Sequence, residues 1–260
     1  MIKKSKPKVL IFSGYGLNCE EETQYAFNLA GGTAHIVHIN DLIQGIKKIK
    51  DYQILAFPGG FSYGDDTGSG KAYANKVRNH LWGDIENFVA QDKLVIGICN
   101  GFQVLTNLGL LPGALTFNDG GRYLDRWVDL KIESNSPWLK GLKTISLPIA
   151  HGEGKFYADK KILKALKTSK SIVARYIKGE ICVSQDLSAN PNGSLEDIAG
   201  LTAYDGRVLG MMPHPERALF TTQWPNFPYL KEKSRRDKKD LSEYGPALQI
   251  FKNAVDYFNL

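Results

Sequence analysis

Cysteine is scarce in this 260-residue sequence, and long apolar runs are missing from it. The three cysteines, Cys19, Cys99 and Cys182, lie far apart with no C-x-x-C pair, which argues against a disulfide framework or a zinc site. No stretch approaches the ~18 apolar residues of a membrane span, and the apolar run after the basic N-terminus is too short for a signal peptide. We therefore expect a cytoplasmic protein with no bound metal and no membrane partner.

Two nucleotide-binding motifs occur only in part. Residues 14–19 read Gly-Tyr-Gly-Leu-Asn-Cys, which lacks the third glycine of the dinucleotide fingerprint. Residues 68–72 read Gly-Ser-Gly-Lys-Ala, so Ala72 stands where a P-loop needs Ser or Thr, and position 65 is not the required glycine. We expect no nucleotide site and no cofactor in this chain.

The formal net charge is +6, and much of the positive charge gathers in local clusters at residues 1–8, 160–170 and 231–239. Nucleic-acid-binding surfaces combine basic residues with aromatic ones, and no aromatic residue is interleaved in these clusters. We expect them to form solvated helix faces and loops, and we expect no nucleic acid partner.

The first hundred residues alternate between strand patterns and helix patterns. Short apolar runs bounded by glycine or proline predict strands, and apolar residues at helical spacing predict helices between them. This alternation favours an α/β fold with an open, mostly parallel sheet and helices on both faces. The predicted strands are 9–12, 34–39, 52–57 and 94–98, and the predicted helices are 20–30 and a long one through Val77, Leu81, Ile85 and Phe88.

The second half of the chain is richer in strand patterns. Tyr204-Asp205-Gly206-Arg207 predicts a hairpin turn, and apolar residues from Ala247 to Phe258 predict a final amphipathic helix. The polar, charged segment 221–244 is expected to be a long loop or an insertion. No linker divides the chain, so we predict a single domain over 1–260. The predicted strands here are 127–132, 145–149, 172–177, 198–204 and 207–211.

One cysteine stands at a turn typical of nucleophiles. Gly97-Ile98-Cys99-Asn100-Gly101 follows a buried strand and opens a helix, as in the nucleophile elbow. Glycines permit the sharp turn, and the partial positive charge of a helix N-terminus favours the thiolate. The alternative is a buried structural cysteine.

A second segment offers a base and an acid. Met212-Pro213-His214-Pro215-Glu216-Arg217 follows the strand 207–211. Each proline favours an extended conformation for the residue before it, and residues i and i+2 of an extended chain point the same way. Glu216 would then orient the His214 imidazole for a Cys–His–acid triad. The alternative is a polar turn whose two side chains face water.

A glycine pair ends the third predicted strand. In Phe57-Pro58-Gly59-Gly60-Phe61, Gly59 and Gly60 let the backbone approach a ligand. Their N–H groups, with that of Asn100, would stabilise a developing oxyanion. The alternative is an ordinary turn from strand to loop.

The three segments together resemble the class I, triad-type glutamine amidotransferases. Within that class, the sequence is most similar to the family of glutaminase subunits of phosphoribosylformylglycinamidine synthase, an enzyme of purine biosynthesis. The similarity covers roughly residues 8–219 and the last helix. Further segments that carry it are Gly16–Glu20, Gly59–Asp65, Pro148–Gly154, Asn190–Ser194 and Met211–Arg217.

This resemblance implies roles for individual residues. Cys99 would attack the side-chain amide of glutamine, and His214, steadied by Glu216, would protonate the departing ammonia. The oxyanion would lie against Gly60 and Asn100, and Gln103 would help to position glutamine. Ammonia would pass to a separate synthetase subunit that carries ATP and magnesium, in a complex with a small accessory subunit.

The sequence departs from the family pattern at 66–69, which is less hydrophobic, and at Gly120, where serine is expected. His151 lies in a family-like segment that fits either catalysis or an interface. Two other functions remain open. The first is a different cysteine hydrolase or amidotransferase on the same fold, distinguished by its product. The second is a catalytically silent regulatory module, which intact Cys99, His214 and Glu216 disfavour.

Overall fold

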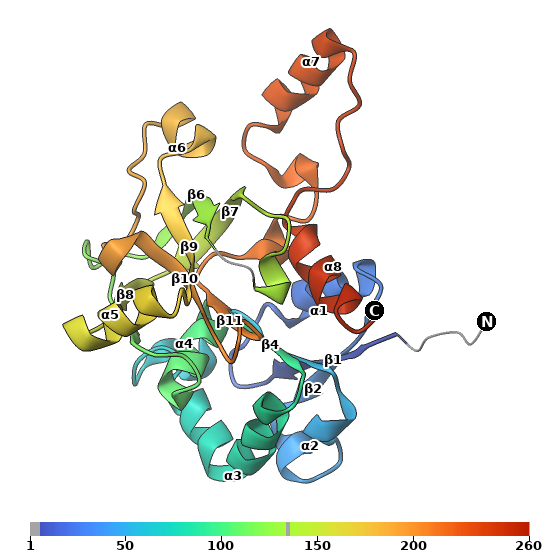
Figure 1. The fold of residues 1–260 in the computed structure, drawn as a ribbon, viewed down its shortest axis with the longest axis vertical. Helices are drawn as coiled ribbons and strands as arrows, with labels where there is room; N and C mark the ends of the chain where they lie inside the picture. Colours follow the sequence, from blue (N-terminus) through green and yellow to red (C-terminus); the bar gives the residue numbers. More distant parts are fainter. Residues whose placement is uncertain (1–5, 134–135, 260) are drawn as a thin grey trace.

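A nine-stranded sheet runs through the whole molecule in the order β2-β1-β3-β4-β11-β10-β9-β6-β7 (Figure 1). The computed structural model describes residues 6–133 and 136–259. The named strands of this sheet are β1 Lys8–Ser13, β2 Thr33–His38, β3 Ile54–Phe57, β4 Leu94–Ile98, β6 Leu124–Ile132, β7 Thr144–His151, β9 Ile172–Ile177, β10 Ile198–Ala203 and β11 Val208–Met211. A small antiparallel pair, β5 Ala114–Thr116 and β8 Lys155–Tyr157, lies beside it.

The sheet has a parallel half and an antiparallel half. Neighbouring strands from β2 through β11 pair in parallel, whereas the pairs from β11 to β7 are antiparallel. This confirms the expected parallel sheet of the first half and the β-rich second half. Parallel strands carry crossover helices on both faces, so their side chains are buried on both sides. Accordingly, all five residues of β4 are buried.

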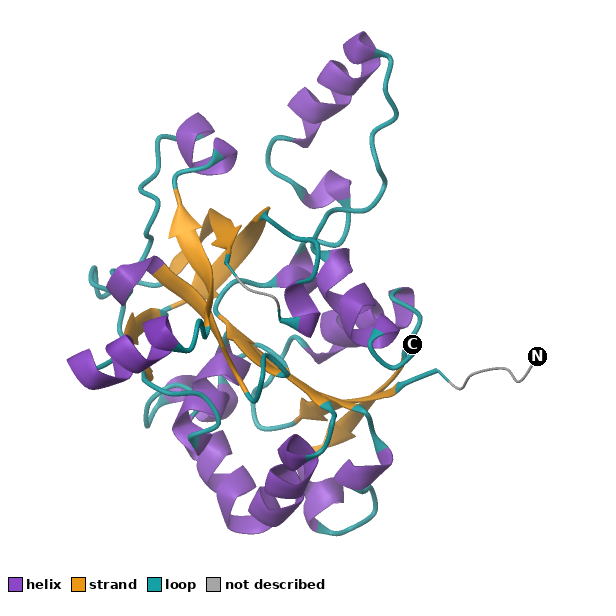
Figure 2. Cartoon of the chain, in the orientation of Figure 1, coloured by secondary structure: helices purple, strands orange, loops and turns teal. Residues whose placement is uncertain are grey.

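Helices cover both faces of the parallel half (Figures 1 and 2). Helices α1 and α8 contact each other on one face, and α3 packs against both α2 and α4 on the other. Long helix α3 buries Val77, Leu81, Ile85 and Phe88, as its spacing predicted. The helices are α1 Glu20–Leu29, α2 Ile39–Ile43, α3 Lys71–Ala90, α4 Asn100–Leu108, α5 Lys160–Thr168, α6 Glu180–Ser184, α7 Phe227–Asp237 and α8 Leu248–Asp256.

Several predicted boundaries are wrong by one or two residues, and local capping explains one of them. Ile39 was expected to end the second strand but begins α2. The His38 ring nitrogen accepts a hydrogen bond from the Asn40 N–H at 3.2 Å and thereby caps the helix one residue early. The basic cluster at 160–170 contains helix α5, as a solvated helix face would, and the Asp159 side chain caps this helix by accepting from Ile162 N at 2.7 Å.

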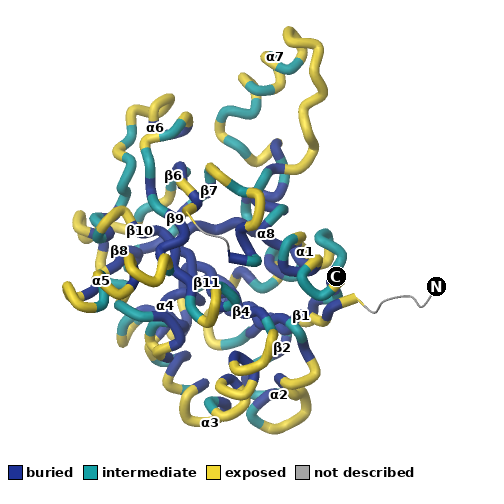
Figure 3. The backbone as a smooth tube through the Cα atoms, viewed as in Figure 1, coloured by how far each residue is buried: buried dark blue, intermediate teal, exposed yellow. Residues whose placement is uncertain are grey.

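Segment 221–244 is not only a loop. It contains α7, and it projects from the body of the molecule (Figure 1). No residue of α7 is buried, and the projecting segment is mostly exposed in Figure 3. Its two ends meet in an antiparallel bridge between Phe220 and Tyr244. In the part of the chain that the structure describes, no helix has the length and apolar character to cross a membrane.

Candidate active site

The carboxyl ends of the parallel strands meet at one edge of the sheet, where open α/β sheets bind their ligands. Segments 14–19, 58–61 and 212–217 follow β1, β3 and β11 there, and Cys99 follows β4. The end of β7 also reaches this edge, because Cys99 Sγ lies 3.6 Å from the Ala150 carbonyl oxygen. The candidate residues predicted from separate segments are therefore brought together.

Cys99 occupies a strained turn between β4 and α4. Its backbone angles are φ +50° and ψ −105°, a conformation that L residues rarely adopt. The flanking glycines are required by space. A Cβ on Gly101 would lie 1.8 Å from the Phe57 carbonyl oxygen, and one on Gly97 would lie 2.6 Å from the Gly101 carbonyl oxygen. The predicted elbow is thus present, with the thiol at the N-cap of α4.

His214 and Glu216 form the contact that the sequence predicted. His214 Nδ1 lies 2.5 Å from Glu216 Oε1, and both residues are only 2% exposed. The local backbone differs from the expectation, because His214 is extended but Pro215–Arg217 forms a 3-10 turn. The turn, rather than an extended chain, brings the carboxylate to the imidazole. The His214 N–H donates to the Pro148 carbonyl oxygen at 2.8 Å and so fixes the turn against β7.

The environment of His214 favours its charged form. Burial alone would lower the pKa of His214, but the adjacent Glu216 carboxylate and the Cys99 side chain raise this pKa well above its usual value. Among the residues that the structure describes, none hydrogen-bonds to His214 Nε2, which is buried. Cys99 Sγ instead donates to the Ala150 carbonyl oxygen. In this arrangement no hydrogen bond joins Cys99 Sγ to His214 Nε2.

The glycine pair after β3 is fixed by the segment that follows β1. The Gly59 carbonyl oxygen accepts from the N–H groups of Asn18 and Cys19, each at 3.2 Å. The N–H of Gly60 belongs to the same trans peptide and therefore points away from that segment. Gly60 has φ +150°, and a Cβ there would lie 2.7 Å from backbone atoms of Gly16, Leu17 and Asn18, so only glycine fits.

The side chains of Asn100 and Gln103 hydrogen-bond to each other. Asn100 Nδ2 donates to Gln103 Oε1 at 2.8 Å and to Asp65 Oδ1 at 3.3 Å. Gln103 Nε2 donates to the Glu153 carbonyl oxygen at 2.7 Å. Burial is the first cause that raises the pKa of Asp65. Asn100 and Gln103 therefore lie within the site, but their side-chain amides are engaged in hydrogen bonds to other residues of the protein. The backbone N–H of Asn100 is at the first position of α4.

His151 is buried in the same region and is a neutral histidine. Burial, reinforced by the charge of His214, lowers the pKa of His151 to about 4. Its Nδ1 lies 3.1 Å from Asn118 Oδ1, and Asn118 Nδ2 donates to the His151 carbonyl oxygen at 2.9 Å. Asn192 Nδ2 donates to the Gly154 carbonyl oxygen at 2.8 Å. Two family-like segments, 148–154 and 190–194, thus meet here with the segment that contains Asn118.

Of the two departures from the family pattern, Gly120 lies outside these contacts, whereas segment 66–69 takes part in them. A Cβ on Gly120 would meet nothing within 4 Å, so a serine there would gain no packing. In segment 66–69, the Ser69 N–H reaches Glu153 Oε2 at 3.3 Å, and this connects the segment to the wall formed by residues 150–154.

The structure adds two residues that the sequence analysis did not assign. Cys19 is buried, and Arg217 Nη2 donates to Cys19 Sγ at 2.9 Å. Within the described residues, one group offers three metal-ligating atoms close together: those of Cys19, His214 and Glu216 lie within 4.8 Å of one another. A metal there would have to replace the hydrogen bond between His214 and Glu216. The sequence did contain a signal for Cys19 and Arg217, because both residues lie in segments that resemble the family.

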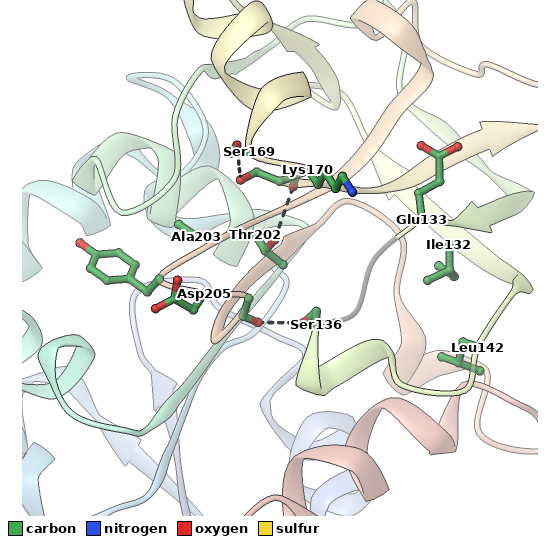
Figure 4. A pocket seen from close by; sticks show the side chains of 12 residues that line it. Ile132, Glu133, Ser136, Leu142, Ser169, Lys170, Thr202, Ala203 and Asp205 are labelled. Atoms are coloured by element: carbon green, nitrogen blue, oxygen red, sulfur yellow. Dashed lines mark hydrogen bonds between the residues drawn. The ribbon is translucent and has the colours of Figure 1, made fainter.

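A cavity of about 850 Å³ lies away from these residues. It is lined by segments around Glu133, Ser136, Lys170 and Thr202, and by the turn of the hairpin between β10 and β11 (Figure 4). That turn precedes β11, whereas His214 follows β11. The cavity therefore opens at the opposite edge of the sheet from Cys99.

Comparisons with known proteins agree on one family. Residues 6–258 match the family model of the CobB/CobQ-like glutamine amidotransferase domain. A phosphoribosylformylglycinamidine synthase subunit PurQ from Methanococcus maripaludis is 51% identical, with 97% of this chain and 99% of that protein covered. Another from Dehalococcoides mccartyi is 40% identical, with 97% and 98% covered. In the structure of PurLQS from Thermotoga maritima, one chain aligns with a TM-score of 0.72 and 30% identity, covering 97% of this chain and 99% of that chain.

Proposed function

Because this chain belongs to the CobB/CobQ-like glutamine amidotransferase family, we propose that it is the glutaminase subunit of a phosphoribosylformylglycinamidine synthase. The observation that carries the proposal is the contact of 2.5 Å between His214 and Glu216 beside Cys99 in its strained turn, in a chain alignable over nearly its full length with PurQ proteins. Its substrate is glutamine, and its products are glutamate and ammonia.

The reaction begins at Cys99. The thiolate attacks the side-chain amide carbon of glutamine, and a C–S bond forms as the carbonyl oxygen becomes an oxyanion. Two backbone N–H groups, those of Gly60 and Asn100, stabilise this charge. The positive end of α4 acts in the same direction, because the Cys99 thiolate and the oxyanion both lie at its N-terminus.

His214 moves the protons. As an imidazolium, it donates a proton to the amide nitrogen, the C–N bond breaks, and ammonia leaves with a glutamyl thioester on Cys99. Neutral His214 then takes a proton from water, which attacks the thioester. Glutamate is released, and Cys99 and the imidazolium are restored. Glu216 holds Nδ1 throughout and stabilises the positive charge.

The ammonia passes to a separate synthetase subunit, and a small accessory subunit belongs to the same assembly. ATP and magnesium act on the synthetase, which uses the formylglycinamide ribonucleotide. Support for this comes from the PurLQS structure, in which one chain resembles this one over nearly its whole length. It also comes from the two incomplete nucleotide motifs of this sequence. We place this reaction in the cytoplasm, with purine biosynthesis.

The test is Cys99→Ser in the assembled enzyme. We expect it to abolish glutamine-dependent synthesis and to leave synthesis from an added ammonium salt at the wild-type rate, since Cys99 only releases ammonia. Product analysis by quantifying glutamate separates this function from peptide hydrolysis. If Cys99→Ser kept most of the glutamine-dependent rate, the nucleophile would be a different residue.

A further inference from the structure

Cys19 lies directly against the proposed base. Its side chain is 1% exposed, and its Sγ lies within 4.8 Å of ligand-type atoms of both His214 and Glu216. Cys19 Sγ donates to Asn18 Oδ1 at 3.4 Å, and His214 Nε2 has no hydrogen bond within the described residues, so the thiol and the imidazole contact each other by packing. The two residues are 195 positions apart in the sequence, so only the folded chain makes this contact.

Steric packing holds the thiol and the imidazole over the same backbone. A Cβ placed on Gly59 would lie 2.7 Å from His214 Cε1 and 3.0 Å from Cys19 Sγ. Both side chains therefore press on the Cα of Gly59 from the same side. The thiol and the ring are packed side by side over Gly59, so removal of the thiol would leave space next to the ring.

Cys19 itself is held from several directions. Its N–H donates to the Gly59 carbonyl oxygen at 3.2 Å, and its own carbonyl oxygen accepts from Thr23 Oγ1 at 2.6 Å. Its Sγ accepts from Arg217 Nη2 at 2.9 Å. Arg217 follows the triad segment directly, so this bond ties the segment after β11 to the segment after β1.

From this geometry we propose that Cys19 is a positioning residue, which keeps the His214 ring aligned between Glu216 and Cys99 and connects that ring to Arg217. The proposal rests on the proposed glutaminase function. Burial raises the pKa of the Cys19 thiol, so the thiol stays neutral and does not compete with Glu216 as a second anion. A neutral acceptor also separates the Arg217 guanidinium from the imidazolium.

The test compares Cys19→Ala and Cys19→Ser with the control Cys182→Ala, a buried thiol away from the site, in the assembled enzyme with glutamine. Displacing a catalytic group by about 1 Å costs up to a hundredfold in rate, so we expect Cys19→Ala to lower kcat by about tenfold to a hundredfold. KM should stay within about twofold. Cys19→Ser should be intermediate, because its hydroxyl still accepts from Arg217. Cys182→Ala should match the wild type.

The pH profile separates positioning from a merely structural role. Loss of Cys19 leaves the His214 ring less firmly held against the Glu216 carboxylate, which favours its charged form, so the alkaline limb of kcat should move to lower pH in Cys19→Ala. An unchanged limb, or a wild-type kcat, would overturn the proposal. Arg217→Met added to Cys19→Ala should cause no further loss. If the wild-type complex itself released no glutamate from glutamine, the proposed function would fail first and independently.

Discussion

At the scale of single residues, charge decides the site. Three titratable side chains of the site are buried: His214, Glu216 and Cys99. Burial opposes the charge on His214, and the two partners overcome it. Among the described residues no anion lies against His151, so burial leaves it neutral. Two buried histidines in one region therefore have opposite protonation states at neutral pH, for a reason that is visible in their neighbours.

We predict that Glu216→Gln is milder than His214→Ala. Glu216 orients and stabilises the imidazolium, whereas His214 transfers the protons itself. Without the carboxylate the pKa of His214 falls, so the imidazolium is lost at a lower pH and the alkaline limb of the glutaminase rate moves down. Rate constants for both variants across pH check this. The reverse order of severity would show that the two roles are misassigned.

We predict that His151 makes the fold sensitive to acid. Between pH 6.5 and about 4 the unfolded chain binds a proton on this residue that the folded chain does not, so the free energy of unfolding falls as the pH falls. The contribution is at most about 3 kcal/mol, from ~1.4 kcal/mol per pH unit. Denaturant unfolding at several pH values, with His151→Gln beside the wild type, measures it. Parallel curves for the two proteins would contradict the prediction.

At the scale of elements, the proposed catalytic residues lie in turns that follow the strands of the sheet. The Gly59–Gly60 peptide is fixed because its carbonyl oxygen accepts two backbone hydrogen bonds from the segment after β1. A flip of this peptide would break both bonds and remove the Gly60 oxyanion donor. The segments after β1 and β3 therefore behave as one unit, and any rearrangement of the oxyanion site involves residues 14–19 as well.

Helix α7 contributes no buried residue to the core, and it gives a separate prediction. It buries no residue, and the Phe220–Tyr244 bridge closes the chain beneath it. Replacing residues 225–240 with a short Gly/Ser linker should change the Tm by no more than about 2 °C, since surface changes away from buried contacts are usually within about 0.5 kcal/mol. Thermal unfolding monitored by circular dichroism checks it. A loss of cooperative folding would mean that α7 supports the fold.

At the scale of the whole molecule, the sheet gathers the proposed site at one edge, and two exposed aromatic residues lie there. Phe61 and Tyr123 are 42% and 50% exposed, with ring centroids 6.0 Å apart. The pKa of Tyr123 is raised, chiefly by burial. Tyr123 also lies close enough to Cys99 and His214 for their charges to affect this pKa. The edge that would release ammonia therefore presents apolar surface next to the proposed nucleophile.

We predict that the isolated chain is a poor glutaminase and becomes active when the synthetase binds. In this structure Cys99 donates to the Ala150 carbonyl oxygen while His214 Nε2 has no hydrogen bond within the described residues. Two small changes would activate the site: a hydrogen bond between Cys99 and His214, and alignment of the Gly60 N–H with the oxyanion. The effect on the rate is large, because one oxyanion donor is worth about a hundredfold to a thousandfold in rate. Steady-state glutamate release with and without the synthetase and its substrates measures the coupling. Equal turnover by the chain alone would reject it.

The sequence by itself determined the features that depend on neighbouring residues. The strand alternation predicted the α/β class, the glycines around Cys99 predicted its turn, and the segment 213–216 predicted the contact of His214 with Glu216. The last two signals lie within about five residues, where backbone preference is a local property, and the first comes from the order of such local segments along the chain. The confirmed β4 and β9 boundaries follow from apolar runs that end at turn residues.

Only the tertiary structure decided which distant segments meet. The Cys19–Arg217 bond joins residues 198 positions apart, and the neutral state of His151 depends on burial that no local pattern reveals. Helix α7 was missed because it has no apolar face against the core, and periodicity is a signal of burial. Long-range packing determines which charged groups lie beside a buried side chain and how far that side chain is shielded from water. Together these two factors set its protonation state.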